Sequence, residues 1–112
     1  MQALTDQALV RVAEVFKALA EPRRLKILNA LREGERNVSE LVAVSDTSQA
    51  NVSKHLALLT QVGIVAREQR GNCVYYRMAD PATFELCDLV CGQLLRKTMA
   101  ELEWQQTFQR DS

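Results

Sequence analysis

The sequence predicts a mainly α-helical domain with one β-hairpin, in the order α-α-α-α-β-β-α. Apolar residues recur at helical spacing along most of the chain. The exception is residues 64–78, which are rich in β-branched and aromatic residues and are interrupted by a Gly-Asn pair typical of a tight turn. The length of 112 residues suits one domain with a modest core.

The first two helices are predicted on either side of the Glu21-Pro22 pair. Between Leu4 and Leu19, apolar residues lie three or four positions apart, which indicates an amphipathic helix. Pro22 indicates the start of the second helix, because proline is tolerated at the first helical position and holds φ at a helical value. We expect Gly34 to end this helix as a left-handed cap.

Residues 38–61 predict a helix-turn-helix. A short helix of about two turns is followed by a Ser-Asp-Thr-Ser cluster of turn and N-cap residues, and a longer helix then runs from Ser48 to Gln61, where Gly63 stops it. A plain helical hairpin would carry more Glu and Lys on its solvated face. The short hydrogen-bonding side chains of the second helix favour a DNA-recognition helix instead.

A wing is predicted over residues 64–78. Its strands are Ile64–Arg67 and Val74–Met78, and the residues between them supply the turn. A hairpin directly after a recognition helix is typical of a winged helix-turn-helix. We therefore expect this domain to span residues 1–104, with a last helix through about Glu103, and a polar tail over 105–112.

The charge balance excludes some classes of protein and allows others. Residues 1–77 hold eleven Lys/Arg and eight Asp/Glu, a net charge of +3, whereas residues 78–112 hold three and six, a net charge of −3. A chain that is neutral overall is not typical of a protein that coats DNA without sequence preference, but a local basic face is enough for phosphate contacts. With one histidine, no glycine-rich phosphate loop and no nucleophile–base spacing, the sequence predicts neither an enzyme nor a small-molecule substrate.

Sequence features also predict where the protein acts. There is no run of about 18 apolar residues, so no membrane span is expected, and no secretory signal is visible. Three cysteines without a disulfide-framework spacing fit a reducing cytoplasm.

Three segments carry a family resemblance. The stretches ALAEPRRLKIL, SQANVSKHLALLTQVGIV and RGNCVYYRMADP resemble the ArsR/SmtB-type winged-helix repressors, over residues 12–95 and in the expected order. The resemblance implies a cytoplasmic homodimer, formed by the first and last helices, on an inverted-repeat operator in double-stranded DNA. Two recognition helices related by a two-fold axis would enter successive major grooves, about 34 Å apart. By resemblance, the DNA-contact candidates are Ser48, Gln49, Asn51, Ser53, Lys54 and His55 on the recognition helix and Arg70 and Asn72 on the wing.

The resemblance also implies release of DNA when an inducer binds, and the family's sensor sites can be compared by position. The Cys-x-Cys site at the start of the third helix would fall on Asn37 and Ser39, which are not thiols. A second site, on the last helix, would fall on Asp80, Ala82, Gln93 and Arg96. Of these only Asp80 is a matching ligand, and one carboxylate cannot hold zinc tetrahedrally.

The remaining candidate ligands are Cys87 and Cys91, four residues apart on the last helix, with Cys73 on the wing as a third. Thiolates select soft ions such as arsenite, antimonite and cadmium. The sequence therefore predicts a repressor that releases its operator when such an ion binds these cysteines, with no cofactor required.

Two alternatives remain open. The same cysteines could sense oxidants or reactive sulfur. They could also be structural, in a DNA-binding dimer that senses nothing, because free cysteine packs like a small apolar residue and Phe84 and Leu94 continue the same apolar stripe. The neighbouring Glu85 and Asp88 would disfavour a thiolate.

Overall fold

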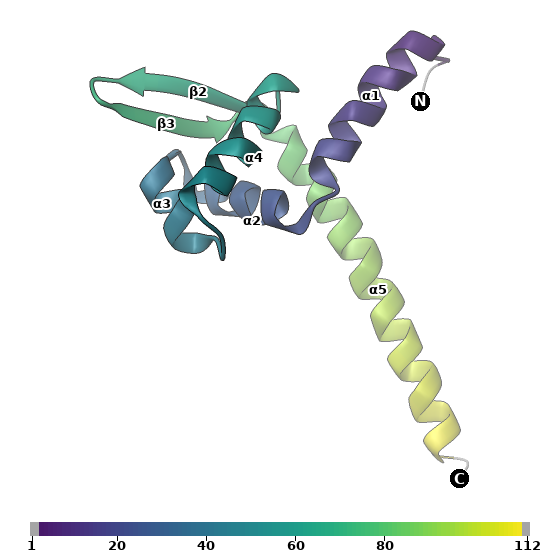
Figure 1. Cartoon of the computed structure of the whole chain (residues 1–112). Coiled ribbons are helices and arrows are strands. Elements are labelled where there is room, and N and C mark those ends of the chain that lie inside the picture. Colours follow the sequence, from purple (N-terminus) through teal and green to yellow (C-terminus); the bar gives the residue numbers. More distant parts are fainter. Residues whose placement is uncertain (1–2, 111–112) are drawn as a thin grey trace. The chain divides into compact units, whose positions relative to one another are not determined.

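The computed structural model describes residues 3–110 of the chain. The chain divides into two compact units, Met1–Asp80 and Pro81–Ser112. In chain order the elements are α1 (Asp6–Leu19), α2 (Pro22–Ala30), the 3₁₀ turn η1 (Leu31–Glu33), β1 (Arg36–Asn37), α3 (Val38–Val44), α4 (Gln49–Gln61), β2 (Val65–Arg70), β3 (Cys73–Met78) and α5 (Ala82–Arg110) (Figure 1). The predicted winged helix-turn-helix is confirmed, with one additional short strand, β1.

The first two helices begin where their capping residues allow. The Thr5 hydroxyl accepts a hydrogen bond from the Ala8 amide at the start of α1, and the Glu21 carboxylate accepts one from the Arg24 amide at the start of α2. The expected role of Gly34 was wrong in one respect. Its φ of 128° is positive, but it caps the 3₁₀ turn η1 and not α2, because the chain tightens into that turn after Ala30.

The helix-turn-helix, α3 and α4, is closed by local hydrogen bonds at each end. Asn37 and Glu40 form a reciprocal capping box at the start of α3. Ser48, predicted as the first residue of the recognition helix, is its N-cap: the hydroxyl accepts from the Asn51 amide at 3.2 Å. At the other end, Gly63 adopts a φ of 84°.

The end of α4 is a Schellman motif. The Ile64 amide donates to the Leu59 carbonyl at 2.9 Å, and the Gly63 amide donates to the Thr60 carbonyl at 3.1 Å. Gly63 is required here because its positive φ is costly for residues with a Cβ.

The sheet has the strand order β1-β3-β2, with both pairs antiparallel. Figure 1 shows β2 and β3 as a long hairpin that follows α4. The predicted turn was too long, since β2 continues to Arg70, which pairs with Cys73. Only Gly71 and Asn72 remain in the loop, and a positive φ at Gly71 alone (61°) matches a type II′ turn, which reverses an antiparallel pair in two residues.

The core of the first unit holds the helix-turn-helix in place. Its most deeply buried large side chains come from α2, α3 and α4, namely Ile27, Leu41, Val52, Leu56 and Leu59. The inner face of α4 is therefore anchored by three apolar residues, which leaves its other face for solvent or a ligand.

The second unit is the helix α5, which is longer than predicted. It runs to Arg110, beyond the expected end near Glu103, because Gln105 and Gln106 are good helix formers and no glycine or proline interrupts them. Asp111 and Ser112, the end of the predicted tail, lie outside the described residues. Among the helices of residues 3–110, none combines the length and the apolar character that a bilayer span requires.

Candidate nucleic-acid interface and thiol positions

The outward face of α4 carries most of the predicted DNA contacts. Gln49, Asn51, Ser53 and Lys54 are exposed. The Asn51 amide group donates to the Thr47 hydroxyl at 2.7 Å, so part of its hydrogen-bonding capacity is already used. Within residues 3–110, no side-chain hydrogen bond or ion pair engages Gln49, Ser53 or Lys54. These three side chains can therefore turn to base edges or phosphates without breaking an existing interaction.

His55 is less exposed than these residues, because its side chain packs against the start of α2. Its side chain is only 17% exposed, with Nε2 3.9 Å from Oε2 of Glu21 and Nδ1 3.4 Å from Nη1 of Arg24. Both partners belong to the start of α2. The sequence contained a signal for this placement, because His55 follows the buried Val52 by three positions and precedes the buried Leu59 by four.

Arg24 is a structural residue that the sequence did not single out. Its Nε donates to the Ala18 carbonyl at 2.6 Å, and its Nη2 donates to the Lys17 carbonyl at 3.3 Å. These carbonyls belong to the last turn of α1, where a helix leaves its acceptors unsatisfied. Arg24 thus joins the end of α1 to His55 on the recognition helix.

The turn before α4 is tied to α2 by an exposed ion pair. Nζ of Lys26 lies 2.8 Å from Oδ2 of Asp46. The hydrogen bond and the positive charge of Lys26 lower the pKa of the Asp46 carboxyl below its ordinary value.

On the wing, the Arg70 side chain contacts residues of the other two strands or next to them. Its guanidinium donates to the Glu35 carboxylate, and its central carbon lies 3.9 Å from the centroid of the Tyr75 ring. The hydrogen bond to Glu35 raises the pKa of the Arg70 guanidinium above its ordinary value. Asn72 is exposed in the turn, and Arg67 and Arg77 add exposed cations to β2 and β3.

The three cysteines are free thiols. Cys73 is exposed at the wing tip, while on α5 Cys87 is half-buried and Cys91 is exposed. In the described part of one chain, no three His, Cys, Asp or Glu residues are grouped so as to hold a metal ion. Asn37, which the sequence resemblance matches to a sensor position, is the capping residue of α3.

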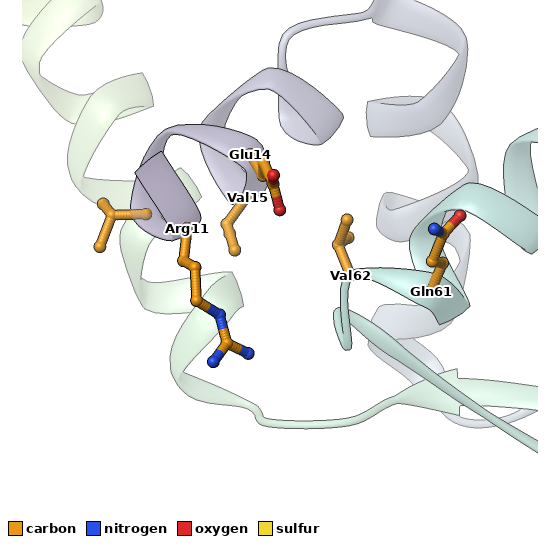
Figure 2. A pocket seen from close by; sticks show the side chains of 6 residues that line it. Arg11, Glu14, Val15, Gln61 and Val62 are labelled. Carbon is orange, nitrogen blue, oxygen red and sulfur yellow. The ribbon is translucent and has the colours of Figure 1, made fainter. Parts of the chain in front are cut away.

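A cleft of about 340 Å³ lies between α1 and the end of α4 (Figure 2). Val15 of α1 and Val62, just after α4, point into it from opposite sides, and Arg11, Glu14 and Gln61 line it as well. The lining includes no thiol and no imidazole, so its chemistry does not suit a soft metal ion.

Comparison with known proteins places this architecture in a family. The family described as "Bacterial regulatory protein, arsR family" matches residues 21–67. The chain is 38% identical over 96 residues to the uncharacterized HTH-type transcriptional regulator Rv0081 of Mycobacterium tuberculosis, with 81% of this chain and 83% of the relative covered. It is 37% identical over 86 residues to a cadmium resistance transcriptional regulatory protein CadC homolog of Staphylococcus aureus, with 76% and 71% covered.

Solved structures agree with these matches. The crystal structure of M. tuberculosis Rv0081 superposes with a TM-score of 0.77 at 33% identity and covers 88% of this chain and 99% of its own. The solution structure of the homodimeric winged helix-turn-helix DNA-binding domain of Mb0332 from Mycobacterium bovis, a possible ArsR-family regulator, gives 0.74 at 33% identity, with 87% and 95% covered. The matched family consists of DNA-binding transcriptional regulators and not of enzymes. This chain therefore belongs to the ArsR/SmtB family of winged helix-turn-helix transcriptional regulators.

Proposed function

We propose that the protein is a homodimeric repressor that binds an inverted-repeat operator in double-stranded DNA, in the cytoplasm, through α4 and the wing. One observation supports this most directly. Val52, Leu56 and Leu59 anchor the inner face of α4, while Gln49, Ser53 and Lys54 of the same helix stand exposed and unengaged. This is the arrangement that a helix needs to enter a major groove.

Exposed apolar residues support the dimer. Leu9, Val10 and Phe16 of α1 are all more than 40% exposed, and α5 exposes Leu94, Leu95, Met99 and Leu102. Helices that keep so many large apolar side chains in contact with water are typical of surfaces that pair with another chain. The relative Mb0332 is homodimeric, and two copies would place two recognition helices in successive grooves.

We further propose that Cys87 and Cys91 bind a soft metal or metalloid ion as the inducer, with Cys73 as a further candidate ligand. Residues four apart on a helix have Cβ atoms about 5–6 Å apart, whereas a disulfide needs about 3.5–4.5 Å. An ion bridged by two sulfurs fits this spacing better than a disulfide within one α5. The CadC homolog of S. aureus is a cadmium resistance regulator, which agrees with a soft ion.

The two alternative roles of the cysteines, redox sensing and structural packing, each require a contact that a single chain does not provide. A redox or reactive-sulfur sensor would need these thiols to react with a second copy or with a small oxidant, because the helix separates them too far for a direct bond. A structural role would need a second copy to cover Cys91, which is exposed in the single chain.

The DNA-binding proposal is tested by selecting duplexes from a random-sequence pool with the purified protein and measuring their binding by fluorescence anisotropy. We expect enrichment of an inverted repeat and an affinity that falls steeply with salt. The variant Lys54→Ala should weaken binding. Failure to enrich any duplex, or affinity independent of salt, would exclude a DNA-binding function for this surface.

A further inference from the structure

We propose that Glu35 is an intramolecular competitor of DNA phosphate for Arg70, and that it thereby sets the contribution of the wing to DNA affinity. This inference rests on the proposed DNA-binding function. It adds a role for a carboxylate that lies outside both the recognition helix and the wing hairpin.

The ion pair between Glu35 and Arg70 joins the two outer strands of the sheet, across the central strand β3. Glu35 directly precedes β1, whose Arg36 pairs with Tyr76 of β3. Arg70 ends β2, beside the turn at the wing tip, and pairs with Cys73. The Arg70 side chain therefore extends back over the sheet toward Glu35 instead of projecting beyond the tip of the wing.

Tyr75 provides the surface on which this side chain rests. Tyr75 pairs with Glu68, two positions before Arg70, so Arg70 and Tyr75 are diagonal neighbours on one face of the hairpin. The central carbon of the guanidinium lies over the Tyr75 ring, 3.9 Å from its centroid. A guanidinium can stack on a ring with its face and donate hydrogen bonds with its edges at the same time. The stacking can thus persist while the partner at the edge changes.

The ion pair is accessible to a competing anion. The Arg70 and Glu35 side chains are 46% and 42% exposed, respectively. Ion pairs at such positions are weak, because water screens them. A phosphate oxygen offers the same acceptor chemistry as the Glu35 carboxylate and suits the planar fork of arginine equally well. The Arg70 guanidinium can therefore exchange one anion for the other.

The exchange of Glu35 for a DNA phosphate at Arg70 changes how strongly DNA affinity depends on salt. When a free cation neutralises a phosphate, counterions leave the DNA, and the slope of log affinity against log salt steepens by about 0.9. When Arg70 leaves Glu35 for a phosphate, the Glu35 carboxylate becomes an uncompensated negative charge beside the DNA, which retains cations there and offsets this release. Removing the Glu35 charge should restore the full contribution of Arg70.

The test compares Glu35→Gln and Glu35→Ala with wild type on a selected duplex, by anisotropy across a salt series. We expect both variants to bind roughly two- to fivefold more tightly at about 0.1 M salt, in line with the strength of an exposed ion pair. The salt slope should steepen by about one unit. In an Arg70→Gln background, the Glu35 substitutions should change neither quantity. Thermal denaturation confirms that each variant folds.

Glu33→Gln is the matched control. Glu33 lies two residues away and is 86% exposed, with its carboxylate 3.5 Å from Arg36, so this substitution removes the same charge without touching Arg70. If Glu33→Gln tightens binding as much as Glu35→Gln, or if the Glu35 effect persists without Arg70, general repulsion is the cause and the proposal is wrong. If the wild type binds no duplex at all, the proposed function itself fails, and this inference fails with it.

Discussion

Nδ1 of His55, on the recognition helix, lies 3.4 Å from Nη1 of Arg24, at the start of α2. Through Arg24, which also binds the last carbonyls of α1, three helices meet at one side-chain cluster. His55 therefore links the recognition helix to α2 and, through Arg24, to the end of α1.

The substitution His55→Ala should lower both stability and DNA affinity. The free energy of unfolding should fall by about 1–2 kcal/mol, because the partly buried Arg24 and Glu21 side chains lose the imidazole as a partner. Lys54→Ala, on the neighbouring exposed position, should leave stability unchanged but reduce the salt slope of DNA binding by about 0.9. Urea denaturation measures the stability of the two variants, and fluorescence anisotropy measures their DNA affinity and its salt slope. An unchanged stability of His55→Ala, with a reduced salt slope, would instead place His55 at the DNA.

The substitution Gly63→Ala should destabilise the protein by about 1–2 kcal/mol. Beyond Gly63 and its two chain neighbours, no atom of the described residues lies within 4 Å of a Cβ added at Gly63, so the cost comes from the φ of 84° and not from a clash. Gly92→Ala in α5 is the control. Its Cβ would meet only the end of the flexible Arg96 side chain, at 3.3 Å, and alanine favours a helix by about 1 kcal/mol. The urea midpoint and the helical circular dichroism signal should both fall for Gly63→Ala and should not fall for Gly92→Ala. Equal losses of stability in the two variants would contradict the backbone argument.

The ion pair between Lys26 and Asp46 should make stability depend on acid pH. Because the pKa of Asp46 is lower in the folded chain, the pair stabilises the fold above the ordinary carboxyl range. This contribution is lost as the pH falls through the lowered pKa. Lys26→Met should return the Asp46 pKa toward its ordinary value, as followed by NMR titration of the carboxyl carbon. High salt should weaken this pH dependence in the wild type. If the Asp46 pKa is the same in Lys26→Met and in the wild type, the pair does not form in solution.

The reduced protein should bind Cd(II) or arsenite with ultraviolet absorption from thiolate-to-metal charge transfer. The double variant Cys87→Ser/Cys91→Ser should lose this absorption and should hold its DNA when the ion is added. Cys73→Ser is the matched single-thiol control, and its response also tells whether Cys73 is a ligand. If the double variant releases DNA like wild type, the inducer does not act through α5.

Several sequence expectations were correct because they depend on neighbouring residues. Pro22 begins α2, and Gly63 and Gly71 take the positive φ values that their turns require. The two-residue strand β1 was missed, because so short a segment has no periodic pattern and is held by pairing with Tyr75 and Tyr76. The DNA-contact residues and the cysteine ligands remain predictions.

The sequence by itself determined the order of the α-helices and the wing hairpin, the limits of the recognition helix to within one residue, and the family. Caps, turns and apolar periodicity act over three or four positions, so they can be read directly from the chain. Only the tertiary structure decided that His55 faces Arg24 and that Arg70 rests between Glu35 and Tyr75. The two polar partners lie 31 and 35 positions away, and a side chain takes its partner from whatever the fold brings within hydrogen-bonding distance.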